Sequence, residues 1–596
     1  MISKMTKYAF LLLSGEKEDF IARLQEIGLV DITRSEKPVD DKSRSISSEL
    51  DRMHGLIQDL RQTAVPEGIL PEEAGGKDLV QLAEETLMHY SETRGRIKAL
   101  TQEVEARSVW GSFDPELVAR LSDAGVPLHF HHLSAKRYQD DWEQDYALTE
   151  IARRKDGVWF VVAGEDPLPG EIPPPGGDVN AAESALHQEE ETLRQLEGKI
   201  LWLQQQIPLL EQRCSDGFSR LEGYLAGVSA NPAAEDTIVT FTGYALTENE
   251  AALAPQLDTL DAYWFAEPAT VEDTPPIALK NNRFVKMFEV LTDMYGRPSY
   301  DGFDPTPFLS VFFLLFFALC MGDAGYGIIL IILGLLLRRG KSMKDLAPLV
   351  ITLGAGTLVV GFFLHTFFSM NIAEWPLFAP CKKIFLPDKI AGYDGAMILS
   401  LVIGVVHVCL ALIIKTVQAT RNHGFLSSLG TWGWTLLIVG GVIVGGFALA
   451  GVIDAALTKW IIIGLGGVSA LGIFLFNTPG RNPLINIGSG LWDTYNTATG
   501  LLGDVLSYLR LYALGLAGAM LGYAFNDLGK MILGDGTGVG NWIFFILILI
   551  LGHTLNIAMC ALGAFVHPLR LNFLEFFKNS GYEGNGRNFR PLSKNS

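Results

Sequence analysis

The side chains most able to do chemistry in this sequence are charged and polar groups set inside long apolar runs. Arg510 is the clearest, because it lies near the middle of the apolar run 491–529. An arginine at the centre of a membrane helix costs about 2.5–3.5 kcal/mol on insertion scales, so such a residue usually faces a polar cavity or a charged partner. Read in steps of three and four, its helix face is mostly small or polar: Asn496, Gly500, Gly503, Ser507, Arg510, Leu514 and Ala517. This face would let a second helix, or a sliding ring surface, approach closely.

The apolar run 542–577 carries a second stripe of the same kind. In steps of three and four it reads His553, Asn556, Cys560, Gly563, His567 and Arg570. A polar stripe over five turns is difficult to explain as a lipid-facing surface, and it indicates the wall of a water-filled path or a helix–helix seam. Simpler roles stay open: Arg570 lies near the end of its run and could reach the headgroups, and the two histidines and Asn556 could bond neighbouring backbone.

The candidate site residues are Arg510, Arg570 and His567, with Asp504, Ser507, Asn496, His553 and Asn556 as candidate members of an ion path. Asp504 lies six residues before Arg510, about 240° round the helix, so it is not the partner of Arg510 within that helix. His365 and His407 stand alone in other apolar runs, and core packing is the expected role for both. Asp304 and Asp323 are expected to cap helix N-termini.

Other chemistries find no support in the sequence. Gly340-Lys341-Ser342 resembles the end of a phosphate-binding loop, but Gly334 lies one residue too far upstream and the segment ends a membrane run. No nucleotide site is therefore expected. The five cysteines are widely spaced and form no C-x-x-C pair, which supports neither a disulfide framework nor a zinc site. No cofactor and no metal are expected.

The charge distribution divides the chain into two halves near residue 300. Residues 1–300 carry 52 acids and 29 bases, a net charge of −23, whereas residues 301–596 carry 14 acids and 18 bases, a net charge of +4. The mean hydropathy is nevertheless +0.24, because the second half is apolar. These values exclude a single globular domain, a secreted disulfide scaffold and a wholly disordered chain, and the acidic balance argues against nucleic-acid binding.

Residues 301–596 are predicted to form an all-α, eight-helix transmembrane domain. A hydrocarbon core of about 30 Å needs about 20 apolar residues for each span. The candidate runs are 306–321, 323–338, 346–369, 395–416, 430–452, 458–477, 491–529 and 542–577. The first two are separated only by Met321-Gly322-Asp323, which predicts a tight hairpin. Basic residues favour a cytoplasmic 338–344 loop, and the N-terminal half and the C-terminus are then also cytoplasmic.

Residues 1–300 are predicted to form an α+β cytoplasmic dumbbell, in which an antiparallel coiled-coil stalk joins two α/β lobes. Strand patterns at 8–13, 29–32 and 237–242, with a helix at 20–28, indicate the proximal lobe. Heptad runs at 46–60 and 193–210 predict the stalk, with the two runs side by side; amphipathic surface helices are the alternative. Helix and strand patterns within 110–170 predict the distal lobe, and Pro208 should kink the second run.

Several motifs carry a family resemblance. They are Asp304-Pro305-Thr306-Pro307-Phe308, Met321-Gly322-Asp323-Ala324-Gly325-Tyr326-Gly327, Gly503-Asp504-Val505-Leu506-Ser507-Tyr508-Leu509-Arg510-Leu511, and His567-Pro568-Leu569-Arg570-Leu571 followed by Glu575-Phe576-Phe577; the first half adds Phe241-Thr242-Gly243-Tyr244 and Pro275-Pro276 before Asn281. Together they resemble subunit a of V-type and A-type rotary ATPases, called subunit I in prokaryotes. The resemblance covers essentially the whole chain.

The resemblance implies a stator subunit with two offset aqueous half-channels and no ATP hydrolysis of its own. Arg510 would face a carboxylate on a rotating ring of proteolipid subunits, keep that carboxylate ionised and block leakage between the half-channels. Arg570, with His567, would lie near the cytoplasmic path. The implied partners are the proteolipid ring, the peripheral-stalk subunits, the lipid membrane and, as a further candidate, the subunit that attaches the central stalk. The chain would be a multi-pass protein of the cell (inner) membrane.

Two positions depart from the family pattern. Eukaryotic relatives have a glutamate where Cys560 stands and a histidine where Gly518 stands, so Asp504, Asn496 and His553 are candidates for the missing polar function. The transported ion, proton or sodium, and the direction of ATP turnover stay open. Two other functions also stay open. A secondary transporter predicts internal repeats, which the membrane half does not show, and a pure assembly scaffold leaves Arg510 unexplained.

Overall fold

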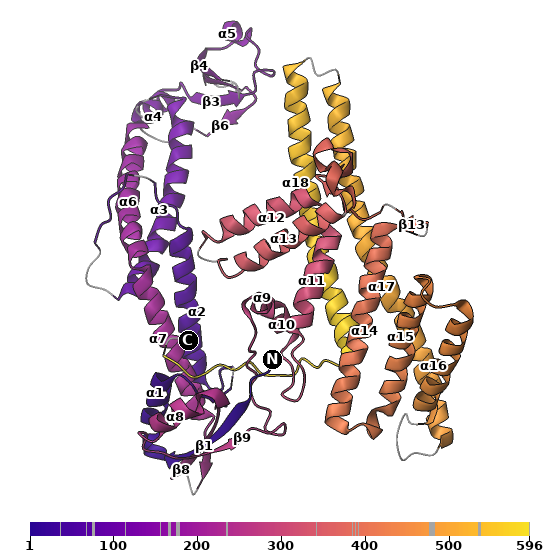
Figure 1. The fold of residues 1–596 in the computed structure, drawn as a ribbon. Helices are drawn as coiled ribbons and strands as arrows, with labels where there is room; N and C mark the ends of the chain where they lie inside the picture. The colour runs from indigo at the N-terminus through magenta and orange to yellow at the C-terminus, as the bar shows by residue number, and fades with distance from the viewer. Residues whose placement is uncertain are drawn as a thin grey trace. The chain divides into compact units, whose positions relative to one another are not determined.

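The structure is a computed structural model. It describes residues 1–594 apart from 36, 67, 74–77, 112, 114, 155–156, 165–167, 174–178, 234–236, 341–342, 384, 388, 391, 476–482 and 535–537, so Lys341 and Ser342 of the rejected phosphate-loop match lie outside the described residues. The fold is mostly helical, with small sheets (Figure 1). Two compact units are present: the first comprises Met1–Leu11, Leu29–Asp31 and Phe241–Pro591, and the second comprises Leu12–Gly28, Ile32–Thr240 and Leu592–Ser596.

The second unit is built on four long helices. Helix α2 (Asp41–Gln62) packs along α7 (Ile207–Val228), and α3 (Leu79–Ser108) packs along α6 (Val179–Gln205). The remaining elements are α1 (Lys17–Ile27), α4 (Pro115–Asp123), α5 (Trp142–Asp145) and a four-stranded sheet of β3 (Leu128–Leu133), β4 (Leu148–Arg154), β5 (Gly157–Ala163) and β6 (Glu171–Ile172), in the order β4-β5-β3-β6. The helix predicted at 20–28 and the helix and strand patterns within 110–170 are confirmed.

The heptad runs form packed helices, but their pairing differs in part from the prediction. Arg61 pairs with Glu211, and Leu50 lies against Gly217, so α2 and α7 run antiparallel. The earlier part of the second run lies in α6, which packs along α3 instead. Helix α3 buries Ala83, Thr86 and Thr93 where a coiled coil would carry leucines, so a search for apolar heptads does not detect it.

Pro208 acts as a helix start. Helix α6 ends at Gln205 and α7 begins at Ile207, with Pro208 in the first turn of α7. Proline is tolerated there because the first N–H groups of a helix have no partner within it. The irregularity predicted for the second heptad run therefore lies at Gln206, between the two helices.

A five-stranded sheet contains β1 (Met5–Leu13), β2 (Asp31–Ile32), β7 (Asn231–Ala233), β8 (Ile238–Leu246) and β9 (Tyr263–Pro268). The strand order is β2-β8-β1-β9, and β7 pairs with β8. β1 and β9 are antiparallel, with Tyr8 opposite Ala266. Helix α8 (Glu250–Leu257) follows β8. The strands predicted at 8–13, 29–32 and 237–242 are confirmed.

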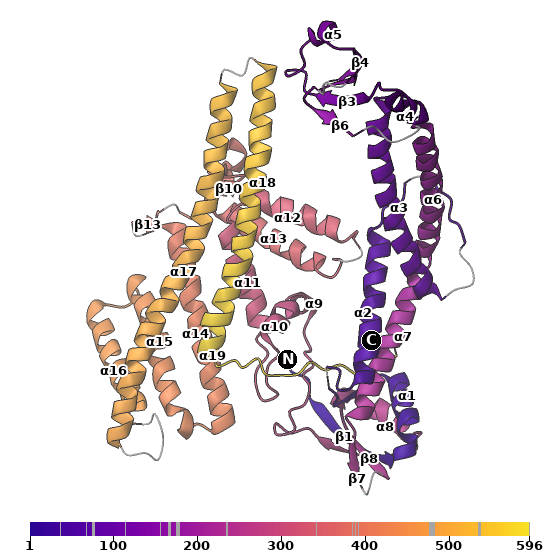
Figure 2. The same ribbon diagram turned by 180° about the vertical axis from the view of Figure 1, so that it is seen from behind.

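The first unit contains the apolar helices. After α9 (Arg283–Lys286) and α10 (Glu289–Tyr295), the described residues form α11 (Thr306–Met321), α12 (Ala324–Leu337), α13 (Ala347–Phe363), α14 (Gly395–His423), α15 (Leu429–Leu449), α16 (Ala455–Leu475), α17 (Pro483–Leu533) and α18 (Val539–Arg570). Five segments, which contain α14 to α18, are long and apolar enough to cross a membrane, whereas α11, α12 and α13 are shorter. Helices α17 and α18 lie side by side (Figures 1 and 2).

The turn between α11 and α12 is held by one buried carboxylate. Gly322 ends α11 in the left-handed conformation, with φ of 58°, and Asp323 caps α12 as predicted by accepting from the backbone N–H groups of Gly325 and Tyr326. The same carboxylate accepts from the N–H groups of Phe368 and Ser369 at 2.9 and 2.5 Å. It therefore ties the start of α12 to the segment that follows α13.

The prediction that the third apolar run is helical to residue 369 is wrong. Helix α13 ends at Phe363. The chain then turns through His365, Phe368 and Ser369, which have positive φ, and forms the short hairpin of β10 (Thr366–Phe367) and β11 (Met370–Asn371). Hydropathy alone does not detect this end, because the acceptors that stabilise the turn belong to Asp323.

The C-terminal residues of the first unit return to the segment 277–297, which precedes the apolar helices. Helix α18 continues into a π-helix (Leu571–Phe576) and α19 (Phe577–Ser580). Residues 586 and 588 then form bridges with Arg297 and Ile277, and the N–H of Arg590 donates to the buried carboxylate of Asp31 at 3.0 Å. This contact joins residues that are 559 positions apart in the sequence.

Candidate functional site

Helices α17 and α18 run antiparallel, and polar groups of one helix contact the other. At one end, His553 Nε2 lies 3.0 Å from the Asn526 amide oxygen. At the other end, beyond α18, the Asn579 amide of α19 donates to the Asp504 carboxylate of α17 at 2.7 Å. Arg510 lies between these two contacts on α17. The two polar stripes therefore belong to facing helices of one pair.

Arg510 is half-buried, and its guanidinium forms no hydrogen bond or ion pair with any residue that the structure describes. The nearest acid in its own helix, Asp504, is engaged by Asn579 instead. Removing a guanidinium from water without a partner is costly, since its charge cannot be neutralised by deprotonation. The geometry thus leaves one fixed positive charge on α17 free to interact with a group outside this chain.

Two further sequence candidates gather near Arg510. Both Arg510 and Arg570 act electrostatically on the His567 imidazole. His567 Nδ1 is enclosed and has no hydrogen-bond partner among the described residues. Arg570 is exposed and, within the described chain, makes no ion pair. Three basic side chains thus come together where α18 approaches its π-helical end.

An acidic group that the sequence analysis did not single out lies beside them. Glu575, in the π-helix, is only 4% exposed. Its carboxylate lies near Ser507 and Asp504, and its Oε2 atom has no hydrogen-bond partner in the described residues. Glu575 is the only acid in the run 542–577, and a lone carboxylate inside an apolar run is a signal that could have identified it.

The other end of the helix pair holds a second polar cluster. The Tyr326 hydroxyl lies 2.8 Å from His553 Nδ1 and accepts from the Asn556 amide at 2.8 Å. Asn556 also donates to the carbonyl of Gly518, and Asn526 donates to the carbonyl of Phe368. His553 and Asn556 are thus brought together, whereas their partners on α12 and α17 are not predictable from the stripe.

The remaining sequence candidates lie apart from these clusters. Asn496 is exposed and joins neither. His407 is buried, lies 3.0 Å from the Tyr508 hydroxyl and stacks on Phe576, which is the core-packing role expected of it. Cys560 and Gly518, the two departures from the family pattern, face each other, because a Cβ on Gly518 would lie 2.5 Å from the cysteine sulfur.

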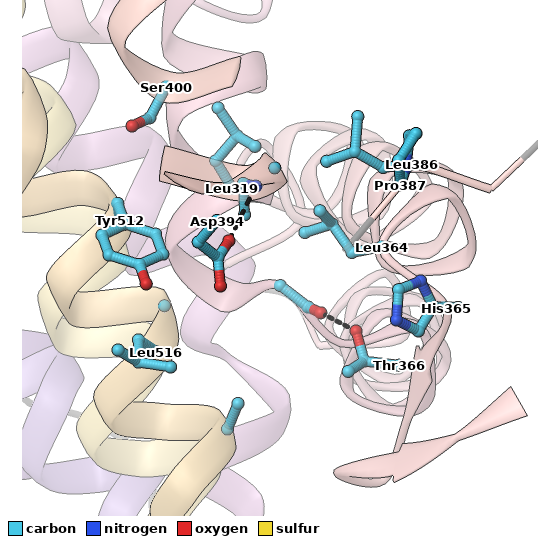
Figure 3. A pocket seen from close by; sticks show the side chains of 15 residues that line it. Leu319, Leu364, His365, Thr366, Leu386, Pro387, Asp394, Ser400, Tyr512 and Leu516 are labelled. Carbon is cyan, nitrogen blue, oxygen red and sulfur yellow. Dashed lines mark hydrogen bonds between the residues drawn. The ribbon is translucent and has the colours of Figure 1, made fainter. Parts of the chain in front are cut away.

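A cavity of about 190 Å³ lies on the opposite side of α17 from Arg510. Tyr512, two residues after Arg510 and therefore about 200° round the helix, lines this cavity together with Asp394 (Figure 3). His365 also lines this cavity. The cavity is mostly apolar and shares no residue with the Arg510 face.

Comparison with known proteins places these residues in a family. The sequence model of the V-type ATPase 116 kDa subunit family matches residues 246–346 and 498–594. The "V-type ATP synthase subunit I" of Borreliella burgdorferi is 24% identical over the whole of both chains, and its counterpart "subunit I 1" of Treponema pallidum is 26% identical over 99% of this chain. The chain is thus similar to V-type ATP synthase subunit I along its whole length, and to the V-type ATPase 116 kDa subunit family in the two matched segments.

The family match covers most of the site. The "A-type ATP synthase subunit I" of Methanocaldococcus jannaschii is 32% identical over 55% of this chain and 50% of the relative, so the chain spans about half the length of this archaeal relative. Of the eight candidate site residues, only Asn496 lies outside the segments that match the 116 kDa family model. Glu575 and Tyr326 lie inside them.

Proposed function

We propose that this chain is the stator subunit that carries ions past the rotating proteolipid ring of a V/A-type rotary ATPase. The single observation that carries the proposal is Arg510, a half-buried guanidinium in an apolar helix with no partner in the described chain. A carboxylate on another subunit would offset the cost of that charge. Because the ring must turn, the pairing has to be transient.

Arg510 would act on the ring carboxylate electrostatically. Arginine stays protonated at every physiological pH, and a nearby fixed cation favours the ionised form of a carboxylic acid. A ring carboxylate that reaches Arg510 would therefore release its ion, and no ion could pass directly from one side of Arg510 to the other. The residue would serve both as the release point and as the block to leakage.

The two polar clusters would form the two half-channels. Ser507, Asp504 and Glu575 would make the cytoplasmic path, with His567 and Arg570 at its inner end. His553, Asn556 and Tyr326 would make the path on the other side. Support comes from their positions at opposite ends of the α17–α18 pair, with Arg510 between them. Asn496, which is exposed, would lie where the cytoplasmic path meets water.

The rest of the chain would anchor this site. Residues 1–300 would form the cytoplasmic dumbbell that binds the peripheral stalks and, as a further candidate, the subunit that attaches the central stalk, and residues 301–596 would form eight spans with both termini cytoplasmic. ATP hydrolysis would take place in other subunits. Labelling of a cysteine introduced near the C-terminus by an impermeant reagent tests the topology: reaction only from outside the cell would contradict it.

The test of the function is ion pumping by the reconstituted complex, with assembly measured in parallel. Arg510→Ala should abolish ion-coupled ATP turnover while the complex still assembles. Arg510→Lys should fail or nearly fail, since an ammonium is more strongly hydrated and can lose its proton when buried. Arg570→Ala should be milder, and Arg421→Ala, which removes an exposed arginine from the last turn of α14, should pump normally. Normal pumping by Arg510→Ala would favour the scaffold function instead.

A further inference from the structure

A polar hollow of about 290 Å³ lies at the C-terminal end of α14, away from the Arg510 site. Three segments of the first unit surround it: the turn 298–303 before α11, the last turns of α14, and the turn 580–583 after α19. None of the eight candidate site residues lines it. It is therefore a separate feature of the fold.

The walls of the hollow are fixed by their own contacts. The N–H of Gly302 donates to the carbonyl of Ser299 at 3.0 Å and closes the first turn. The Tyr582 hydroxyl donates to the carbonyl of Gly296 at 2.6 Å, and its ring packs edge-on against Phe303. Because hydrogen bonds and ring contacts hold these segments without a ligand, the hollow is preformed, which lowers the entropy cost of binding.

Charged groups of both signs line the hollow without pairing. Lys415, Gln418 and Asn422, spaced by three and four residues, lie on one face of α14, while Asp301 and Glu583 belong to the other two walls. Within the described chain, Lys415, Asp301 and Glu583 make no hydrogen bond or ion pair. The hollow therefore offers an ammonium and two amides on one side and two carboxylates on the other.

The hollow lies at the depth of lipid headgroups if α14 spans the membrane. From Gly395, where α14 begins, to Lys415 is 20 residues, or about 30 Å of helix. That length equals the thickness of the hydrocarbon core. The apolar stem of Lys415 can remain beside lipid while its ammonium reaches the interface, which is the level of the lipid headgroups.

We propose that this hollow binds the phosphoethanolamine headgroup of a membrane phospholipid. The phosphate would accept hydrogen bonds from Lys415 and from the amides of Gln418 and Asn422. The primary ammonium would donate to Asp301 and Glu583. A choline headgroup has no N–H to donate, and a phosphoglycerol headgroup would bring negative charge to the two carboxylates without an ammonium. The proposal depends on α14 crossing the membrane and not on ion transport.

The experiment is native mass spectrometry of the full chain in detergent with three phospholipids of identical acyl chains. Phosphatidylethanolamine should bind about tenfold more tightly than phosphatidylcholine or phosphatidylglycerol, which corresponds to about one charge-assisted hydrogen bond. Lys415→Gln should lower phosphatidylethanolamine binding about tenfold. Asp301→Asn combined with Glu583→Gln should remove its advantage over phosphatidylcholine. These side chains are exposed, so the variants should fold, and thermal unfolding would verify it.

The control is Arg421→Gln, which removes a basic side chain from the same end of α14 but not from the hollow; it should bind lipid as the unsubstituted chain does. Equal binding of phosphatidylglycerol, or unchanged binding by Lys415→Gln, would overturn the proposal. Soluble phosphoethanolamine should compete only weakly. If it bound as tightly as the lipid, the ligand would be a small phosphoamine and the lipid assignment would be wrong.

Discussion

The carboxylate of Asp323 should contribute more to stability than any ordinary helix cap. It is 4% exposed, caps α12 through two N–H groups and also holds the N–H groups of Phe368 and Ser369. Losing a cap costs about 1 kcal/mol, and each buried N–H left without an acceptor costs about 1–3 kcal/mol. Since neighbouring losses overlap, Asp323→Ala should reduce the free energy of unfolding by about 3–5 kcal/mol.

The matched control is Asp394→Ala. Asp394 also caps an apolar helix, but it is exposed and accepts from one backbone N–H, that of Ala396, at 2.9 Å, so its loss should cost about 1 kcal/mol. The stability loss of Asp323→Asn should lie between those of the two alanine variants, because the NH₂ group of the asparagine would face the N–H of Ser369. Unfolding of the full chain in mixed micelles by detergent titration measures all three. An Asp323→Ala cost no larger than that of Asp394→Ala would refute the reasoning.

Three further predictions follow from local geometry. Gly361→Ala should lower the free energy of unfolding by about 3 kcal/mol, because the added Cβ would lie 2.2 Å from the backbone nitrogen of Ala324 at the start of α12. Gly464 has open space around it, so Gly464→Ala should leave thermal unfolding nearly unchanged. Hydrogen bonds, first from Lys7, lower the pKa of Asp273 from 3.8 to about 2. The pair therefore adds at most about 2 kcal/mol to the free energy of unfolding above pH 4, and this contribution is lost as the pH falls to 2. The Asp273→Asn variant should not show that loss when acid unfolding is followed by fluorescence. Glu575→Gln keeps the side-chain shape but carries no exchangeable acid proton, so pumping by the assembled complex should fall at least about tenfold; unchanged pumping would remove Glu575 from the path.

The order of helices could be predicted from the sequence, because apolar runs and their lengths depend on local composition. The prediction failed where a distant group decides the outcome. Helix α13 ends early because Asp323, some 45 positions away, supplies the acceptors that its following turn needs. Helix α3 escaped detection because Ala83 and Thr93 occupy its buried seam, and small residues carry little hydrophobic signal.

The candidate site was predictable along each helix but not between helices. Periodicity placed His553 and Asn556 on one face of α18, and the structure joins both to the same hydroxyl. That hydroxyl belongs to Tyr326 on α12, and no pattern within one helix shows which other helix will cover its polar face. Glu575 was missed for a different reason: it lies in the π-helix that follows α18, where the α-helical periodicity that identified the stripes no longer applies.

The contact between Arg590 and Asp31 has a consequence for how the chain is made. The two residues are separated by 559 positions, and ribosomes add about 5–20 residues per second. The carboxylate of Asp31 therefore waits about 30–110 s for its partner, until the last apolar helix has left the ribosome. A chain that stalls or is cleaved before residue 587 lacks both the Arg587 and the Arg590 contacts of this buried acid. Completion of translation therefore changes the contacts of a buried acid in the N-terminal sheet.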